Sequence, residues 1–443
     1  MIDLAQTSIQ SSEQPKQLEQ QKNIQITICD QRIKYKKNFS LNTMGCSSSS
    51  VSDQVISINE NSDNLVYKKR FTEMEYKYFG KSGLKVSSIC FSAYNLNIKN
   101  LKKSEFTNVI KKAYSLGINF YETSEQYCNG QLDVLLGEAF QTLAIPREEL
   151  VISQTIRQPE VDQIQKNNKK TSIFGHSHKQ IIESVKNSLN RLQISYLDIV
   201  YCDRFDEDTP LEETIKAFNH LIKQGLVNYW GTSRWTAAQI FEARCICAKL
   251  KLSPPVIQQV EYNMLFRDTF EVEYSRLFDK YKVNSTIWNP FCFDILNSCT
   301  KMSQSLSSKL KQIKEKDQYA VQEYNYQISE NNLNQIQNII KKISLITKKL
   351  ECTFSQLAMA WILANRDATS VIFCTNNQNQ LEEIVESIEI AKLITPEINS
   401  EIDNILSNLP ILGLDFKTFS PKKGRREKYL VQNQNQNINS IQT

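Results

Sequence analysis

The chain has 443 residues, a formal net charge of +5 and 40% hydrophobic residues. This length exceeds one average domain but suits one α/β barrel with tails. No apolar run approaches the roughly 20 residues of a membrane-spanning helix, and Met1 is not followed by a signal-peptide core. The modest, dispersed charge does not favour nucleic acid as a partner. Eleven cysteines without CxxC pairs are typical of reduced cytoplasmic thiols, and no His and Cys spacing predicts a metal site.

Residues 1–73 are rich in Gln, Ser, Asn and Lys and lack a sustained apolar period, which predicts a disordered tail. Within this tail, Met44 to Ser50 reads MGCSSSS. Read from Met44, the stretch matches the N-myristoylation pattern, with Gly45 as the acylated residue and Cys46 as a palmitoylation candidate. The pattern acts only if translation begins at Met44, and the alternative is a Ser-rich linker that matches by chance. Lipidation predicts peripheral association with the cytoplasmic face of the plasma membrane.

From residue 74 to residue 413, apolar strand patterns alternate with amphipathic helix patterns. A hairpin is predicted around 81–83, where Gly83 permits a positive φ. Thr209 and Glu212 have the spacing of a capping box before a helix, and so do Thr353 and Gln356. The expected strands are 88–91, 118–121, 150–153, 197–201, 227–231, 256–261, 285–288 and 370–374. The expected helices are 104–115, 131–140, 179–192, 211–222, 237–250, 273–281, 336–346, 353–365, 378–388 and 397–407.

Eight strand–helix repeats predict an α/β fold of the (β/α)8 TIM barrel class, in which functional residues lie at the carboxyl ends of the strands. A doubly wound sheet is the alternative, but no G-x-G-x-x-G follows a predicted strand. A Ser-, Lys- and Gln-rich stretch predicts a solvated insertion at about 297–334. Residues 414–443 predict a Gln- and Asn-rich tail with a basic cluster at Lys422, Lys423, Arg425, Arg426 and Lys428.

Several stretches of the sequence resemble a known protein family. Residues 76–87, 117–137, 219–235 and 259–262, with WGTSRW at 230–235, resemble the aldo-keto reductases. Residues 178–235, 258–266 and 350–361 are similar in particular to the β subunits of voltage-gated potassium channels. The resemblance covers about 74–413. It implies a barrel of aldo-keto reductase type, NADP(H) as cofactor, a homotetramer, and the cytoplasmic domain of a potassium channel as partner.

The resemblance also implies a catalytic group of tyrosine, lysine, aspartate and histidine. A carbonyl that receives hydride needs a proton, and a lysine cation makes the tyrosine acidic enough to supply it. Tyr127 stands at the tyrosine position, but Glu122 replaces the aspartate and Thr155 replaces the lysine. Asp203 stands at the histidine position, where channel β subunits carry asparagine. We expect nearby carboxylates to raise the pKa of Tyr127, leaving it a structural residue, although Arg157 is a candidate ion-pair partner for Glu122.

The resemblance implies a nucleotide site in which some binding residues are retained and others are replaced. Several residues that bind the nucleotide in the family are absent here. Ser92 to Tyr94 stand in place of a glycine-containing loop, Cys374 in place of a glycine and Ile384 in place of an asparagine. Two phosphate-binding cations of the family have no counterparts at 297–300. Losing two charge-assisted contacts costs on the order of a hundredfold or more in affinity, so we expect NADP(H) binding to be weakened or lost. The positions assigned to the cofactor are Ser233, Arg234 and Gln259 at the nicotinamide amide, Trp288, Asn289 and Pro290 near the nicotinamide and pyrophosphate, and Asn376, Gln380 and Glu383 toward the adenine end.

Three functions of different class follow. The first is an accessory or regulatory subunit of the channel β type with a degraded catalytic site. The second is an active NADPH-dependent aldehyde or ketone oxidoreductase that uses Tyr127. The third is a sensor that holds NADP without turnover. Thr155 argues against the second function, and Ser233 with Gln259 supports the third; we expect the first.

Overall fold

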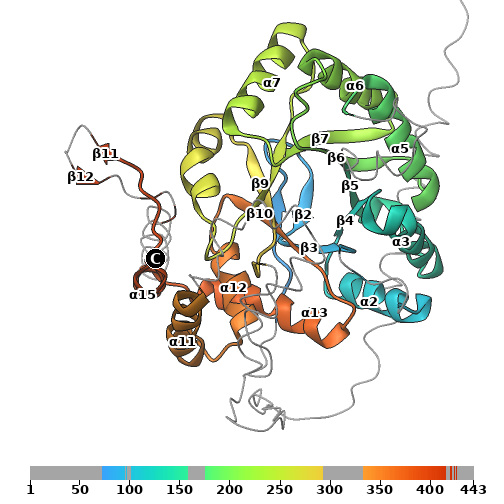
Figure 1. Ribbon diagram of the computed structural model, residues 1–443. Coiled ribbons are helices and arrows are strands. Elements are labelled where there is room, and N and C mark those ends of the chain that lie inside the picture. The colour runs from blue at the N-terminus through green and yellow to red at the C-terminus, as the bar shows by residue number, and fades with distance from the viewer. Residues whose placement is uncertain are drawn as a thin grey trace, which may run out of the picture. The chain divides into compact units, whose positions relative to one another are not determined.

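The computed structural model describes residues 72–94, 96, 101–157, 175–292, 333–415, 420–421, 424 and 426. Eight parallel strands close into a barrel in the order β10-β3-β4-β5-β6-β7-β8-β9, with helices around them (Figure 1). The predicted (β/α)8 barrel is therefore confirmed. Its strands are β3 (Ile89–Ser92), β4 (Phe120–Ser124), β5 (Val151–Arg157), β6 (Leu197–Asp203), β7 (Val227–Ser233), β8 (Ile257–Glu261), β9 (Asn284–Trp288) and β10 (Ala368–Phe373).

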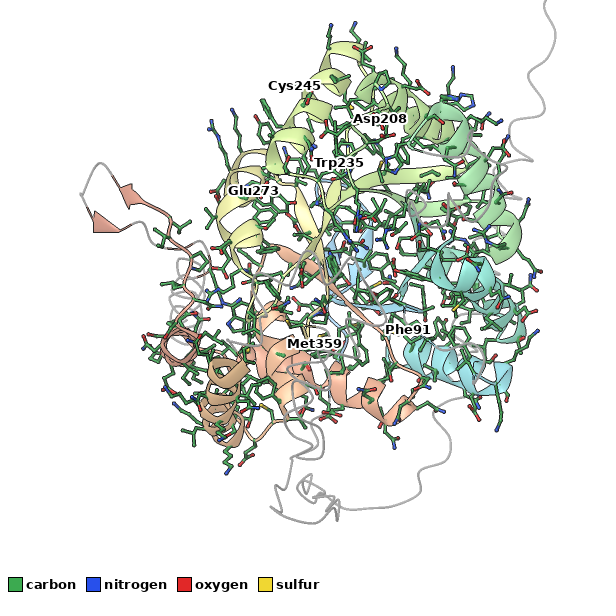
Figure 2. All side chains as sticks on the ribbon, viewed as in Figure 1. Phe91, Asp208, Trp235, Cys245, Glu273 and Met359 are labelled. Atoms are coloured by element: carbon green, nitrogen blue, oxygen red, sulfur yellow. The ribbon has the colours of Figure 1, made fainter. Side chains whose placement is uncertain are left out.

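The helices pack apolar faces onto the outer surface of the barrel. In Figure 2, Phe91 and Met359 lie among the side chains between strands and helices, whereas Cys245 lies on the outer side of its helix. None of the described helices is long and apolar enough to cross a membrane. The α-helices are α2 (Lys103–Ser115), α3 (Gln131–Thr142), α5 (His178–Leu192), α6 (Leu211–Lys223), α7 (Ala237–Leu250), α11 (Leu333–Lys349), α12 (Phe354–Leu363), α13 (Gln378–Val385), α14 (Ser387–Lys392) and α15 (Pro396–Leu406).

A hairpin of β1 (Tyr76–Tyr78) and β2 (Lys85–Ser87) precedes the barrel. Its Phe79 is fully buried and meets Phe120 edge-on, with ring centroids 6.0 Å apart. Val151 and Ile257 belong to the same apolar cluster, and each opens its strand. The hairpin therefore fills the amino-terminal end of the barrel with apolar side chains and leaves the carboxyl end for polar ones.

Local turn and capping chemistry differs from the sequence predictions at two places. The positive φ of the first hairpin lies at Gly80 (φ +58) rather than Gly83, and a Cβ there would meet the Val256 carbonyl oxygen at 2.3 Å. The capping box of Thr209 and Glu212 is wrong. Pro210 is the N-cap of α6 without a side-chain bond, because the Thr209 hydroxyl instead bonds the Asp206 carboxylate. The predicted box of Thr353 and Gln356 is confirmed.

Three expected elements have other bounds or forms. The helix expected at 273–281 consists of two short π-helical segments, η5 (Thr269–Glu273) and η6 (Leu277–Tyr281). The helix expected at 378–388 is divided into α13 and α14 around Glu386. Within the expected tail, β11 (Leu414–Asp415) pairs with β12 (Ser420–Pro421), and Arg426 is buried rather than part of a solvent-facing basic cluster. The lipidation pattern, with Gly45 and Cys46, and the stretch 297–332 lie outside the described residues.

Candidate functional site

Polar side chains face inward at the carboxyl ends of the barrel strands. The strand register pairs Ser92 with Glu122. Along the next strands, Arg157 pairs with Asp203, Asp203 with Ser233, and Ser233 with Gln259. Because side chains alternate along a strand, paired positions point to the same side of the sheet. The register therefore gathers these residues, which come from six strands, at one end of the barrel.

Glu122 accepts hydrogen bonds from three hydroxyl groups. Ser92 Oγ donates to Glu122 Oε2 at 2.6 Å, Thr155 Oγ1 donates to Oε1 at 3.2 Å, and the Tyr127 phenol donates to Oε1 at 3.0 Å. The side chain of Glu122 is only 2% exposed. Burial raises the pKa of Glu122 to about 7, although the three hydroxyl donors act in the opposite direction. A carboxyl group that is half-protonated near neutral pH thus occupies the centre of the site.

Tyr127 begins η2 (Tyr127–Gly130), separated from the end of β4 by two residues, and the next three residues have positive φ. This turn brings the phenol back over the strand end, where its ring centroid lies 5.4 Å from that of Tyr94. Burial, and after it the charge of Glu122, hold the pKa of Tyr127 well above its ordinary value. The direction is the one expected from the sequence, with burial as the larger cause. At neutral pH the phenol is protonated and donates a hydrogen bond to Glu122.

Arginine side chains surround Asp203 rather than Glu122. Arg157 Nε lies 3.4 Å from Asp203 Oδ2, and Arg234 Nε lies 3.6 Å from Oδ1. The expected pair of Arg157 with Glu122 is therefore replaced by a pair with Asp203. The register gives the reason, because Glu122 pairs with Ser153, four positions before Arg157, or roughly 13 Å along the strand at about 3.3 Å per residue.

The residues assigned to the nicotinamide amide do meet. Ser233 Oγ is 2.8 Å from Asp203 Oδ1 and 3.1 Å from Gln259 Oε1. The backbone N–H of Arg234, at φ +59, donates to the Gln259 carbonyl at 3.1 Å. The guanidinium of Arg234 lies over the Trp288 ring, 4.6 Å from the centroid. The group presents hydroxyl, amide and aromatic surfaces of the kind that orient a planar carboxamide.

Neighbouring strand ends add a second polar group. Asn289, at φ +56, donates from its side-chain amide to Glu261 Oε1, and Asn263 donates to the Asn289 carbonyl at 3.1 Å. Pro290, the next residue, is buried. Sequence reasoning missed Glu261 and Asn263, and also the bond from Ser92 to Glu122. The alternation of inward-facing positions along β3 and β8 is the signal that could have placed Ser92, Glu261 and Asn263 at this end.

The residues assigned to the adenine end bond within the protein. Gln380 Oε1 accepts from the Thr375 hydroxyl at 2.6 Å, and Glu383 Oε1 accepts from the Thr353 hydroxyl at 2.6 Å. Asn376, between β10 and α13, is exposed. The two side chains expected to bind adenine therefore each use one oxygen atom in a bond within the protein. Residues 297–300 lie outside the described segments, and within those segments no cluster of His, Cys, Asp and Glu is arranged to hold a metal.

Comparisons with known proteins agree with this architecture. The model of the family described as "Aldo/keto reductase family" matches residues 88–407. The chain is 32% identical over 346 residues to a protein of Arabidopsis thaliana described as "Probable voltage-gated potassium channel subunit beta". It is 31% identical over 346 residues to a protein of Oryza sativa subsp. japonica with the same description. Each comparison covers 76% of this chain and 98% of the relative.

Proposed function

The chain belongs to the aldo/keto reductase family, and we propose that it serves as an accessory, regulatory subunit of the potassium channel β type. In this proposal its carbonyl-reducing site has lost activity while the nicotinamide end of the nucleotide site is kept. The observation that carries the proposal is the environment of Tyr127, whose phenol donates to the buried carboxyl of Glu122. The similarity to two plant proteins described as probable potassium channel β subunits supports the class of partner.

The loss of activity follows from the charge around Tyr127. A proton donor is efficient when its pKa lies near the working pH. Burial and the carboxylate of Glu122 both move the pKa of Tyr127 further above that range. Thr155, at the position where the family's lysine is expected, contributes a hydroxyl to Glu122 and no positive charge. General acid catalysis, worth about a hundredfold to ten-thousandfold in rate, is therefore not available from this tyrosine.

NADP(H) fits the described residues at one end. A bound NADPH would supply hydride, and Ser233 with Gln259 would orient its carboxamide. The Trp288 ring would pack nearby, in contact with the Arg234 guanidinium. Toward the adenine, Gln380 and Glu383 each already hold a threonine hydroxyl through one oxygen atom. We therefore propose a site that retains NADP(H) weakly and reports its presence without turnover.

The experiment is a titration of the full chain with NADPH, followed by nucleotide fluorescence. We expect saturable binding that weakens by about twofold to tenfold in Gln259→Ala, the loss of one hydrogen bond. Gln380→Ala is the matched control at the other end and should change affinity less. Absence of saturable binding would contradict the retained nucleotide site.

The proposed partner is tested by co-purification with the cytoplasmic domain of a voltage-gated potassium channel, and failure to co-purify would contradict it.

A further inference from the structure

Arg426 is buried, although it lies in a stretch whose composition indicates an exposed tail. Its residue exposure is 3%. The match to the family model ends at residue 407, so Arg426 lies outside the matched residues. After Gly413 the chain forms the antiparallel pair of β11 and β12, which extends outward on the side of α15 (Figure 1). Arg426 itself contacts residues of the barrel domain.

The guanidinium of Arg426 has a partner on each nitrogen. Nε donates to Asn399 Oδ1 at 2.8 Å, Nη1 donates to the Tyr262 hydroxyl at 3.5 Å, and Nη2 donates to the Trp361 carbonyl oxygen. Its central carbon also lies over the Trp361 ring, 4.1 Å from the centroid. A planar group with donors at its rim and an aromatic face beneath is what arginine, and not lysine, can match.

The acceptor atoms around Arg426 are oriented by a second set of bonds. The Tyr262 hydroxyl donates to Glu271 Oε1 at 2.6 Å, which turns its oxygen lone pair toward other donors. The side-chain amide of Asn399 donates to Asp403 Oδ2 at 2.7 Å, which leaves its carbonyl oxygen facing Arg426. Both side chains are thus oriented as acceptors by bonds that do not involve the arginine. Preorganised acceptors of this kind favour a bound cation.

Among the described residues, Arg426 brings a second positive charge close to a pair of carboxylates. Glu271 and Asp403 supply two negative charges, and Arg267 pairs with both, at 2.9 Å and 2.6 Å. Arg267 is itself buried, with an exposure of 3%. Arg426 supplies the second positive charge through Tyr262 and Asn399. Among the described residues, an empty position here would leave two carboxylates with one arginine, which is costly where the group is buried.

We propose that Tyr262, Trp361 and Asn399 form an arginine-binding socket that docks the chain's own carboxyl-terminal segment through Arg426. The socket is built from three elements of the barrel domain: the end of β8, α12 and α15. Capture of this segment then depends on the side chain of Arg426. This assignment does not depend on nucleotide binding or on a channel partner.

The test uses the full chain with a protease site introduced between Asp415 and Ser420, cut after folding. The released segment should remain bound through gel filtration, and its rebinding is measured by labelling the segment at its carboxyl terminus. In Arg426→Ala we expect affinity to fall by at least about thirtyfold, as for loss of a buried charged partner. Arg425→Ala changes the same charge at the adjacent position and should weaken binding by less than about threefold.

Two further variants separate recognition of the side chain from general effects. Arg426→Lys keeps the charge but not the planar contacts, and should bind more weakly than the native segment. Asn399→Ala, on α15, should release the segment although the segment itself is unchanged. Equal losses in Arg425→Ala and Arg426→Ala would assign the contact to net charge and overturn the socket. Retention of the segment in Arg426→Ala would overturn it as well.

Discussion

Replacing Arg267 by alanine is expected to lower the free energy of unfolding by about 3–5 kcal/mol, the usual cost of breaking a buried ion pair from one side. Arg267 Nε and Nη2 bond both oxygens of Glu271, and Nη1 donates to Asp403 at 2.6 Å. Burial acts to lower the pKa of Arg267, but the Glu271 carboxylate raises it above the ordinary value. Removing the guanidinium leaves two carboxylates close together and a void beside the Trp361 ring.

Urea unfolding of the full chain, monitored by tryptophan fluorescence, measures this effect. Arg276→Ala is the matched control, because Arg276 lies nearby in sequence but is exposed, and such surface changes stay within about 0.5 kcal/mol. A destabilisation of Arg267→Ala no larger than that of the control would show that the carboxylates find other partners. The network that supports the socket would then not be held by this arginine.

The second large effect concerns the titration of Glu122. Its pKa in the folded chain is about 7 against an ordinary 4.5, so the folded state binds a proton that the unfolded state has released. Its favourable contribution is complete below about pH 4.5 and is lost as the pH rises to about 7. Glu122→Gln should therefore gain stability relative to the native chain over this range, by roughly 3 kcal/mol at most.

Substitutions at Thr155 should move this titration in opposite directions. Thr155→Val removes a hydroxyl that lowers the pKa of Glu122, so the pKa should rise further. Thr155→Lys places an ammonium group beside the carboxylate and should lower the pKa of Glu122 by about 1–3 units. Carbon-13 NMR of the glutamate carboxyl groups, with Glu122→Gln for assignment, reads each value. A native Glu122 that titrates near 4.5 would contradict the effect of burial at this site.

Sequence patterns predicted the barrel because its strands are apolar where they are covered by helices. The strand ends were harder to place. β5 continues to Arg157, β6 to Asp203 and β7 to Ser233, in each case two or more residues beyond the predicted end. These final residues are polar because they face the mouth of the barrel, and a polar residue after an apolar run resembles the start of a loop.

Contacts between distant residues were beyond the reach of sequence patterns. Arg426 meets Trp361 and Tyr262, which are 65 and 164 positions away in the chain, and a single arginine in a basic stretch carries no periodic signal. Asp203 similarly attracts Arg157 because the strand register places the two side by side. The resemblance to the family was enough to predict that Thr155 stands in place of the expected lysine. That Ser92 joins Thr155 and Tyr127 on Glu122 required the geometry.

The most direct test of the account is aldehyde-dependent oxidation of NADPH by the purified full chain at neutral pH. A panel of aromatic aldehydes should be used, with Tyr127→Phe measured in parallel. Burial and Glu122 raise the pKa of Tyr127 well above its ordinary value, so the phenol is a poor proton donor. The account therefore predicts no oxidation above the background in either protein. Turnover by the native chain that disappears in Tyr127→Phe would contradict it and identify an active carbonyl reductase.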